Sequence, residues 1–169
     1  MKRLILVRHA KTEPLTDALS DFERQLKKRG HNDARLVANE LKDKGFCPDT
    51  IISSPAVRAI QTARVFADVF EIPALQIKQA GFIYDGETTA GLLSGITSMA
   101  GGEETVLVVG HNPDIAMLSM RLTGEAFAHF PTTATLVIAF SASTWSDISV
   151  GTGRAEYFVY PRLLKDEQQ

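Results

Sequence analysis

The chain has 169 residues and 44% hydrophobic content, which fits one domain with a sizeable core. A formal net charge of −2 argues against nucleic acid or an anionic membrane surface as a partner. The single cysteine excludes an intramolecular disulfide and a cysteine-rich metal site, and it fits a reducing compartment. No stretch approaches the length of a membrane span, so we expect a cytoplasmic protein.

The first predicted element is a buried strand of four apolar residues that runs directly into Arg8 and His9. Apolar residues at three- and four-residue spacing predict the helices that follow, and glycines mark their ends. Up to residue 70 we expect a strand over 4–7, a polar loop over 11–20 and a short helical turn over 21–30 that Gly30 closes. A helix over 31–44, a strand over 49–52 and a helix over 55–70 follow.

The second half continues the alternation of strands and helices. We expect a brief strand over 74–77, an irregular segment over 79–87 and a helix over 88–99. A strand over 104–109, a helix over 113–122 and two strands over 135–140 and 155–160 follow. A turn region rich in Ser, Thr and Gly separates the last two strands, so we expect them to be antiparallel. The pattern indicates a doubly wound α/β fold with a mostly parallel sheet, helices on both faces and an antiparallel edge. Residues 165–169 are expected to form a disordered tail.

Three of the predicted strands end in residues that suit an anionic ligand. Arg8 and His9 follow the first strand, Arg58 lies in the first turn after the second, and His111 follows the strand over 104–109. The carboxyl ends of parallel strands meet at one edge of a sheet, where α/β proteins bind ligands. Guanidinium groups match phosphate oxygens with paired donors. The combination predicts a pocket for a phosphoryl group.

Two helix starts add to this pocket. Ser54 and Asn112 are predicted N-caps, each next to a proline that suits the start of a helix. The free N–H groups and positive dipole ends of both helices would point to the same edge. We therefore expect Asn112 to join Arg8, Arg58 and His111 in binding phosphate.

A histidine in such a pocket can act as a nucleophile. Neutral imidazole attacks phosphorus to form a phosphohistidine, which water then hydrolyses. An ordinary pKa of about 6.5 makes the neutral form available near neutral pH. Arginines and a second histidine would neutralise the phosphoryl oxygens, so this chemistry needs no metal and no cofactor. Each motif alone is an ordinary turn or helix start, and the same pocket without turnover would be a phosphate-binding module.

The three segments together resemble the histidine phosphatase superfamily in its RHG/RHA form. They read Leu6-Val7-Arg8-His9-Ala10, Ser53-Ser54-Pro55-Ala56-Val57-Arg58-Ala59-Ile60-Gln61-Thr62-Ala63 and Gly110-His111-Asn112-Pro113. The small size, the alanine after the histidine and the stretch over 21–30 make the chain most similar to SixA-type phosphohistidine phosphatases. The resemblance implies a phosphoglycerate mutase-like domain over residues 1–164.

The resemblance also implies roles for individual residues. It makes His9 the nucleophile and places Arg8, Arg58 and His111 in the phosphate pocket. Arg24 would line the substrate groove, with Asp21 as its partner. The implied substrate is phosphohistidine in a partner protein such as a phosphotransfer domain.

The general acid is the point at which the sequence leaves two functions open. Many members of the superfamily protonate the leaving oxygen with an acidic residue near the third strand, where this chain offers Asp85 and Glu87. A small-molecule phosphomonoesterase would use one of them as its acid. A phosphohistidine phosphatase needs less help, because a nitrogen leaves easily once protonated. Asp85 would then cap a turn.

Overall fold

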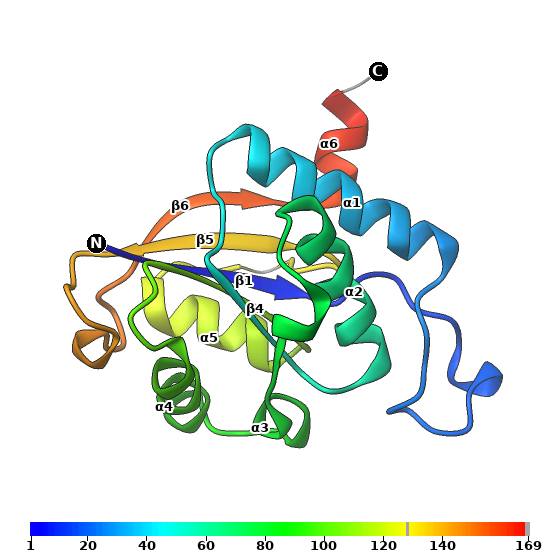
Figure 1. Cartoon of the computed structure of the whole chain (residues 1–169), viewed down its shortest axis with the longest axis horizontal. Helices are drawn as coiled ribbons and strands as arrows, with labels where there is room; N and C mark the ends of the chain where they lie inside the picture. The colour runs from blue at the N-terminus through cyan, green and yellow to red at the C-terminus, as the bar shows by residue number, and fades with distance from the viewer. Residues whose placement is uncertain (128, 168–169) are drawn as a thin grey trace.

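The computed structural model describes residues 1–127 and 129–167. Within them, six strands form one sheet in the order β3-β2-β4-β1-β5-β6 (Figure 1). The strands are β1 (Lys2–Arg8), β2 (Thr50–Ser53), β3 (Lys78–Gln79), β4 (Thr105–Gly110), β5 (Thr135–Phe140) and β6 (Arg154–Val159). The α-helices are α1 (Lys28–Asp43), α2 (Val57–Val69), α3 (Gly81–Asp85), α4 (Thr89–Ala100), α5 (Asp114–Thr123) and α6 (Pro161–Glu167). Short 3-10 turns are η1 (Leu15–Asp17), η2 (Ala74–Gln76) and η3 (Trp145–Asp147).

Strand β1 is the seam between the parallel and antiparallel parts of the sheet. It pairs in parallel with β4, and β4 pairs in parallel with β2. On its other side β1 pairs antiparallel with β5, which pairs antiparallel with β6. The predicted α/β fold with an antiparallel edge is confirmed, including the N-terminal strand and the final antiparallel pair.

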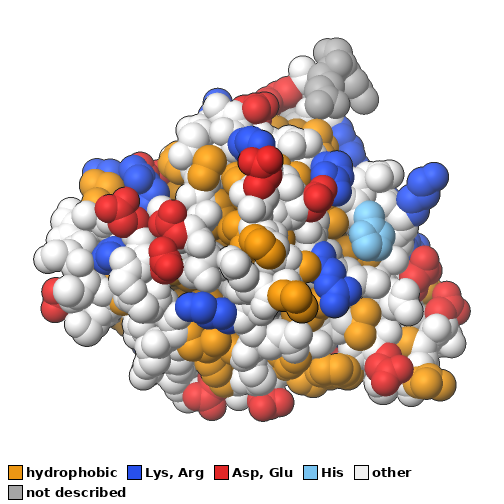
Figure 2. All heavy atoms as spheres, viewed as in Figure 1, with side chains coloured by type: hydrophobic (Ala, Val, Ile, Leu, Met, Phe, Trp, Pro, Cys, Tyr) orange, Lys and Arg blue, Asp and Glu red, His pale blue; other side chains and the backbone are white. Residues whose placement is uncertain are grey.

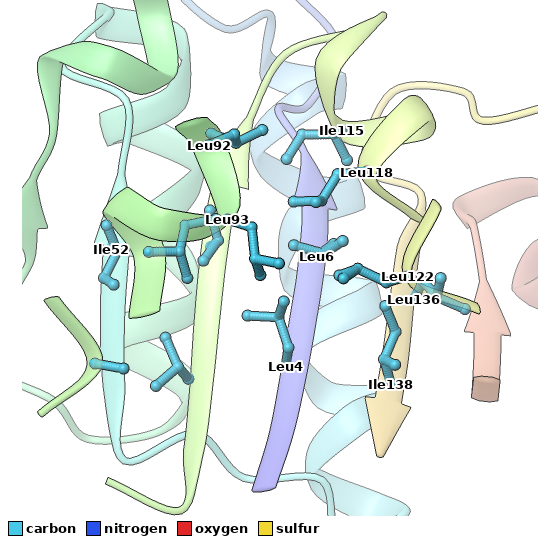
Figure 3. Close-up of a cluster of buried hydrophobic side chains, with 14 of the residues drawn as sticks. Leu4, Leu6, Ile52, Leu92, Leu93, Ile115, Leu118, Leu122, Leu136 and Ile138 are labelled. Atoms are coloured by element: carbon cyan, nitrogen blue, oxygen red, sulfur yellow. The ribbon is translucent and has the colours of Figure 1, made fainter. Parts of the chain in front are cut away.

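The sheet separates two hydrophobic cores because successive strand side chains point to opposite faces. Leu4 and Leu6 of β1 pack with the apolar faces of α4 and α5, as Figure 3 shows. Ile5 and Val7 pack on the other face with α1 and α2. All four side chains are fully buried, which explains why this strand is an unbroken apolar run.

Glycine 30 does not close a helical turn, and the helix predicted over 21–30 is wrong. Residues 21–27 form turns and a bridge, and α1 begins at Lys28, three residues earlier than expected. Gly30 lies in the first turn of α1, where a Cβ would overlap the carbonyl oxygen of Lys11. Glycine is needed there for a close approach of two backbones, which a reading of glycine as a helix stop misses.

The structure also differs from the elements predicted over residues 74–87. The expected strand at 74–77 is the turn η2, and β3 follows it at Lys78–Gln79. The segment predicted to be irregular, 79–87, contains α3. One helical turn is too short to show a hydrophobic period, so the sequence carries no signal for it.

The predicted disorder of residues 165–169 is wrong for residues 165–167, which form the last turn of α6. Lys165 Nζ lies 2.7 Å from Oδ1 of the buried Asp33 in α1 and fastens this turn. Residues 168–169 lie outside the described residues.

The contact at Gly30 gives the first testable prediction. Gly30→Ala should lower the free energy of unfolding by about 1–2 kcal/mol, because overpacking of about 1–3 kcal/mol outweighs the gain of about 0.5–1 kcal/mol in helix propensity. Urea denaturation measures the change. Gly102→Ala is the control, because its Cβ would enter open space. Equal stability of the wild type and Gly30→Ala would contradict the assigned contact.

Candidate active site

The three predicted strand ends meet at one edge of the sheet. The pairing sets Arg8 opposite Gly110 and Ser53 opposite Val109. Beyond the paired residues, the backbone N–H of His9 donates to the carbonyl of Gly110 at 3.0 Å. The rings of His9 and His111 lie with their centroids 5.3 Å apart. The ends of β1, β2 and β4 therefore share one site.

His9 is buried, with 7% of its surface exposed, and its ring orientation is fixed. Its Nδ1 lies 2.8 Å from the carbonyl oxygen of Ala10. A carbonyl oxygen can only accept, so Nδ1 carries the hydrogen and Nε2 keeps its lone pair. Burial lowers the pKa of His9 to about 3, against the opposing effect of the Ala10 hydrogen bond and with help from the charges of His111, Arg58 and Arg8. His9 is thus held as a neutral imidazole with an unprotonated Nε2.

His111 is also held neutral. Burial, followed by the charge of Arg58, lowers its pKa to about 4, although Asp21 acts in the opposite direction. Its Nε2 lies 2.7 Å from Oγ of Ser54. Ser54 Oγ accepts the N–H of Ala56 at 3.2 Å, which leaves the hydroxyl proton free for Nε2 of His111. In that tautomer Nδ1, which is buried and has no partner among the described residues, is a donor for a ligand oxygen.

Ser54 and Asn112 are not N-caps, so both predicted caps are wrong. The caps are Ala56 for α2 and Pro113 for α5, without a side-chain hydrogen bond. The Ser54 hydroxyl is instead placed between a backbone N–H and His111. The Asn112 amide donates to the carbonyl of Phe130 at 2.8 Å.

Two arginines approach the same edge with one end of each guanidinium anchored. Arg58, 7% exposed, donates from Nη1 to the backbone oxygen of Asp21 at 2.8 Å and from Nη2 to its carboxylate at 3.1 Å. Arg8 donates from Nη1 to the carbonyl of Phe130 at 3.2 Å. The Nε of each is buried and has no partner among the described residues. An unsatisfied buried donor costs about 1–3 kcal/mol, so these atoms suit the oxygens of a bound anion.

Asp21 joins the predicted groove residue Arg24 to the pocket. Its carboxylate accepts from Arg24 Nη1 at 3.2 Å, from Arg58, and from the Tyr84 hydroxyl at 2.9 Å. Burial alone would raise the pKa of Asp21, but the hydrogen bonds from Tyr84 and Arg24 and the charge of Arg58 hold it below its ordinary value. Asp21 therefore stays ionised and fixes Arg58. The pairing of Arg24 with Asp21 expected from the sequence is present.

Tyr84 and Thr133 border the pocket and were missed by the sequence analysis. The Tyr84 ring lies edge-on to His111, with centroids 5.6 Å apart. Thr133 is buried at φ +66°, and its N–H donates to the carbonyls of Arg8 and His9 at 3.0 and 3.1 Å. Left-handed backbone at a β-branched residue is strained, and such strain concentrates at functional sites. A threonine gives no local sequence signal for this conformation.

Asp85 and Glu87 lie at and just beyond the end of α3, and both are exposed. Asp85 follows Tyr84 directly. Glu87 packs against Gly91 in the first turn of α4. Across residues 1–127 and 129–167, no hydrogen bond or ion pair joins either carboxylate to the two histidines.

Among residues 1–127 and 129–167, no three His, Cys, Asp or Glu side chains form a group that could hold a metal ion. No helix in those ranges is both long and apolar enough to cross a membrane.

Comparison with known sequences points to one family. Residues 4–80 match the sequence profile of the histidine phosphatase superfamily, branch 1. An uncharacterized protein of Mycobacterium tuberculosis H37Rv is 30% identical over 166 residues, which cover 92% of this chain and all of that protein. The phosphohistidine phosphatase SixA of Escherichia coli K12 is 28% identical over 166 residues, 96% of each chain.

Solved structures share the fold over nearly the whole chain. The protein histidine phosphatase SixA complexed with tungstate has a TM-score of 0.80 and 25% identity, covering 96% of this chain and 99% of that one. A mycobacterial glucosyl-3-phosphoglycerate phosphatase has a TM-score of 0.66 over 95% of this chain and 99% of its own. At 16% identity it shows the fold alone.

The neutral state of His9 gives a prediction for stability. An unfolded histidine titrates at about 6.5, so as the pH falls below that value the unfolded chain binds a proton that the buried His9 binds only near pH 3. Acidification from pH 7 to pH 5 should therefore destabilise the wild type more than His9→Gln, by up to about 1.4 kcal/mol per pH unit.

Urea denaturation at several pH values measures this difference. His31→Gln replaces an exposed histidine and should follow the wild type. Parallel stability curves for the wild type and His9→Gln would show that His9 is not held neutral.

Proposed function

The chain belongs to the histidine phosphatase superfamily and is a phosphatase, and we propose that it dephosphorylates phosphohistidine in a partner protein through a covalent phosphohistidine on His9. The observation that carries this proposal is the hydrogen bond from His9 Nδ1 to Ala10, which leaves Nε2 unprotonated in a pocket of unsatisfied donors. The partner would be a phosphotransfer domain or a similar protein. A reducing cytoplasm fits a chain with one cysteine.

The reaction has two steps. Nε2 of His9 attacks phosphorus while the bond from phosphorus to the substrate imidazole breaks, and that imidazole takes a proton from solvent water as it leaves. Water then attacks the phosphoryl group on His9, which releases phosphate and restores the neutral ring. Arg8, Arg58 and His111 would neutralise the phosphoryl oxygens in both steps. These residues supply the required charge, so the scheme does not depend on a metal ion.

The nature of the leaving group supports phosphohistidine over an ester. An alkoxide needs a positioned acid within hydrogen-bond reach, whereas an imidazole is protonated more easily near neutral pH. Asp85 and Glu87 are exposed, and Glu87 is packed against α4. The similarity to SixA over 96% of both chains supports the same choice.

A small-molecule phosphomonoesterase is the second candidate, in which Asp85 or Glu87 acts as the acid. One observation favours it: Asp85 follows Tyr84, whose ring lies beside His111 and whose hydroxyl contacts Asp21. A module that binds phosphate without turnover is disfavoured, because binding alone would not require a buried His9 with an unprotonated Nε2.

His9→Ala should reduce turnover of a histidine-phosphorylated protein by about a thousandfold or more, because no other residue replaces the nucleophile. Phosphate release in the presence of EDTA measures the loss, and circular dichroism checks the fold. His31→Ala, at an exposed site, should retain full activity. Undiminished turnover by His9→Ala would refute the covalent route.

Replacement of the two candidate acids separates the two substrate classes. Asp85→Asn and Glu87→Gln should leave kcat/KM for the phosphohistidine protein within about twofold, because no acid is required there. The same variants are measured on a panel of small phosphomonoesters. A wild type that prefers an ester, together with a loss of about a hundredfold in either variant, would favour the esterase instead.

A further inference from the structure

Loop 11–27 carries an exposed surface beside the pocket that the proposed chemistry does not use. We propose that this surface docks the phosphorylated partner protein through a patch of aliphatic and Lys or Arg side chains next to its phosphohistidine. We call it the loop surface, formed by Leu15, Leu19, Phe22, Glu13, Asp17 and Glu23. The inference rests on the proposed function, because it identifies the kind of protein that His9 would serve.

The apolar part of the loop surface consists of three large side chains within eight residues. Leu15 is 54% exposed, Leu19 94% and Phe22 37%. Single exposed apolar residues are ordinary, but three within eight residues of a loop that contacts the site favour a contact surface. In Figure 1 this loop projects beyond the carboxyl end of β1.

The charged part of the loop surface is acidic. Glu13, Asp17 and Glu23 line a hollow of about 590 Å³ together with Leu19 and Leu26. No basic side chain among the described residues lines it. Figure 2 shows acidic and hydrophobic side chains side by side at the projecting end of the molecule. Negative potential beside apolar groups attracts a partner that presents cations around an apolar contact.

Direct contacts hold the loop surface against the catalytic pocket. Phe22 accepts the backbone N–H of Val57 at 3.0 Å and packs edge-on to Tyr84, with ring centroids 5.1 Å apart. Arg24, which pairs with Asp21, also donates from Nε to the carbonyl of Glu13 at 3.3 Å. A partner seated on the loop therefore lies next to the phosphoryl site.

The chemistry of the surface identifies a protein as the occupant. A small phosphomonoester has no basic and aliphatic patch with which to contact the loop surface. Nucleic acid would be repelled by the acidic residues. A folded protein with a basic and aliphatic patch satisfies both parts of the surface and delivers a phosphohistidine to His9.

Three substrates test this inference on the full chain. Two are peptides with one phosphohistidine each, flanked either by leucine and arginine or by serine and glutamate, and the third is free phosphohistidine. The wild type should prefer the leucine-arginine peptide. Leu19→Ser and the double variant Asp17→Asn/Glu23→Gln should each lower its kcat/KM by about threefold to tenfold and leave free phosphohistidine unchanged. The double variant should also weaken the dependence of this rate on salt.

Matched controls lie just before β3 and just before β4, at the amino ends of the parallel strands and thus away from the site. Leu75→Ser removes a fully exposed leucine, and Glu103→Gln/Glu104→Gln removes two exposed charges. Both should behave as the wild type. Equal rates of wild type and loop variants on the leucine-arginine peptide would overturn the docking surface while leaving the proposed function intact. A wild type that releases no phosphate from these substrates or from a histidine-phosphorylated protein would instead refute the proposed function.

Discussion

Parallel pairing of β1 with β4, and of β4 with β2, is the constraint on which the site depends. Each strand leaves the sheet at the same edge, and the hydrogen bond from His9 N–H to Gly110 continues the pairing one residue past the end of β1. The apolar runs that bury these strands thus also decide where His9, Ser54 and His111 lie. Packing in two cores and placement of the chemistry have the same physical origin.

Burial of converging positive charge is the second feature of the site. Two arginines converge there, and burial, helped by the arginine charges, lowers the pKa of His9 to about 3 and that of His111 to about 4. One carboxylate, Asp21, balances Arg58 and links it to Arg24 and Tyr84. The remaining donors, Nε of Arg8 and of Arg58, have no partner among the described residues. A phosphoryl group would satisfy them, and a neutral His9 would be ready to accept it.

The sequence predicts this fold well where one signal dominates. Buried strands are unbroken apolar runs, so the strand before Arg8 and the one before His111 could be recognised. Gly45 and Gly124 follow helix ends as expected, with φ of +82° and +75°. Local signals fail where a residue serves a distant partner. Gly30 makes room for another backbone, and the Ser54 hydroxyl is directed to His111 instead of capping a helix.

The contacts of the site that the sequence does not predict depend on the path of loop 11–27. Asp21 reaches Arg58, 37 positions away, and Tyr84 reaches Asp21 across 63 positions. The hydrophobic periodicity of the sequence gives no signal for contacts between residues so far apart in the chain. The left-handed backbone of Thr133 also follows from its place beside Arg8 and His9, not from its own propensity. Sequence motifs therefore name the reacting groups, and the fold supplies the residues that orient them.

The position of the phosphoryl group on the enzyme tests the central claim most directly. Rapid alkaline quenching of the wild type during turnover of phosphoramidate, followed by mass spectrometry and ³¹P NMR, locates the adduct. We expect one phosphohistidine, on Nε2 of His9, because Nδ1 donates its hydrogen to the carbonyl of Ala10. A phosphoryl group on Nδ1 of His9 or on His111, or turnover without any adduct, would contradict it.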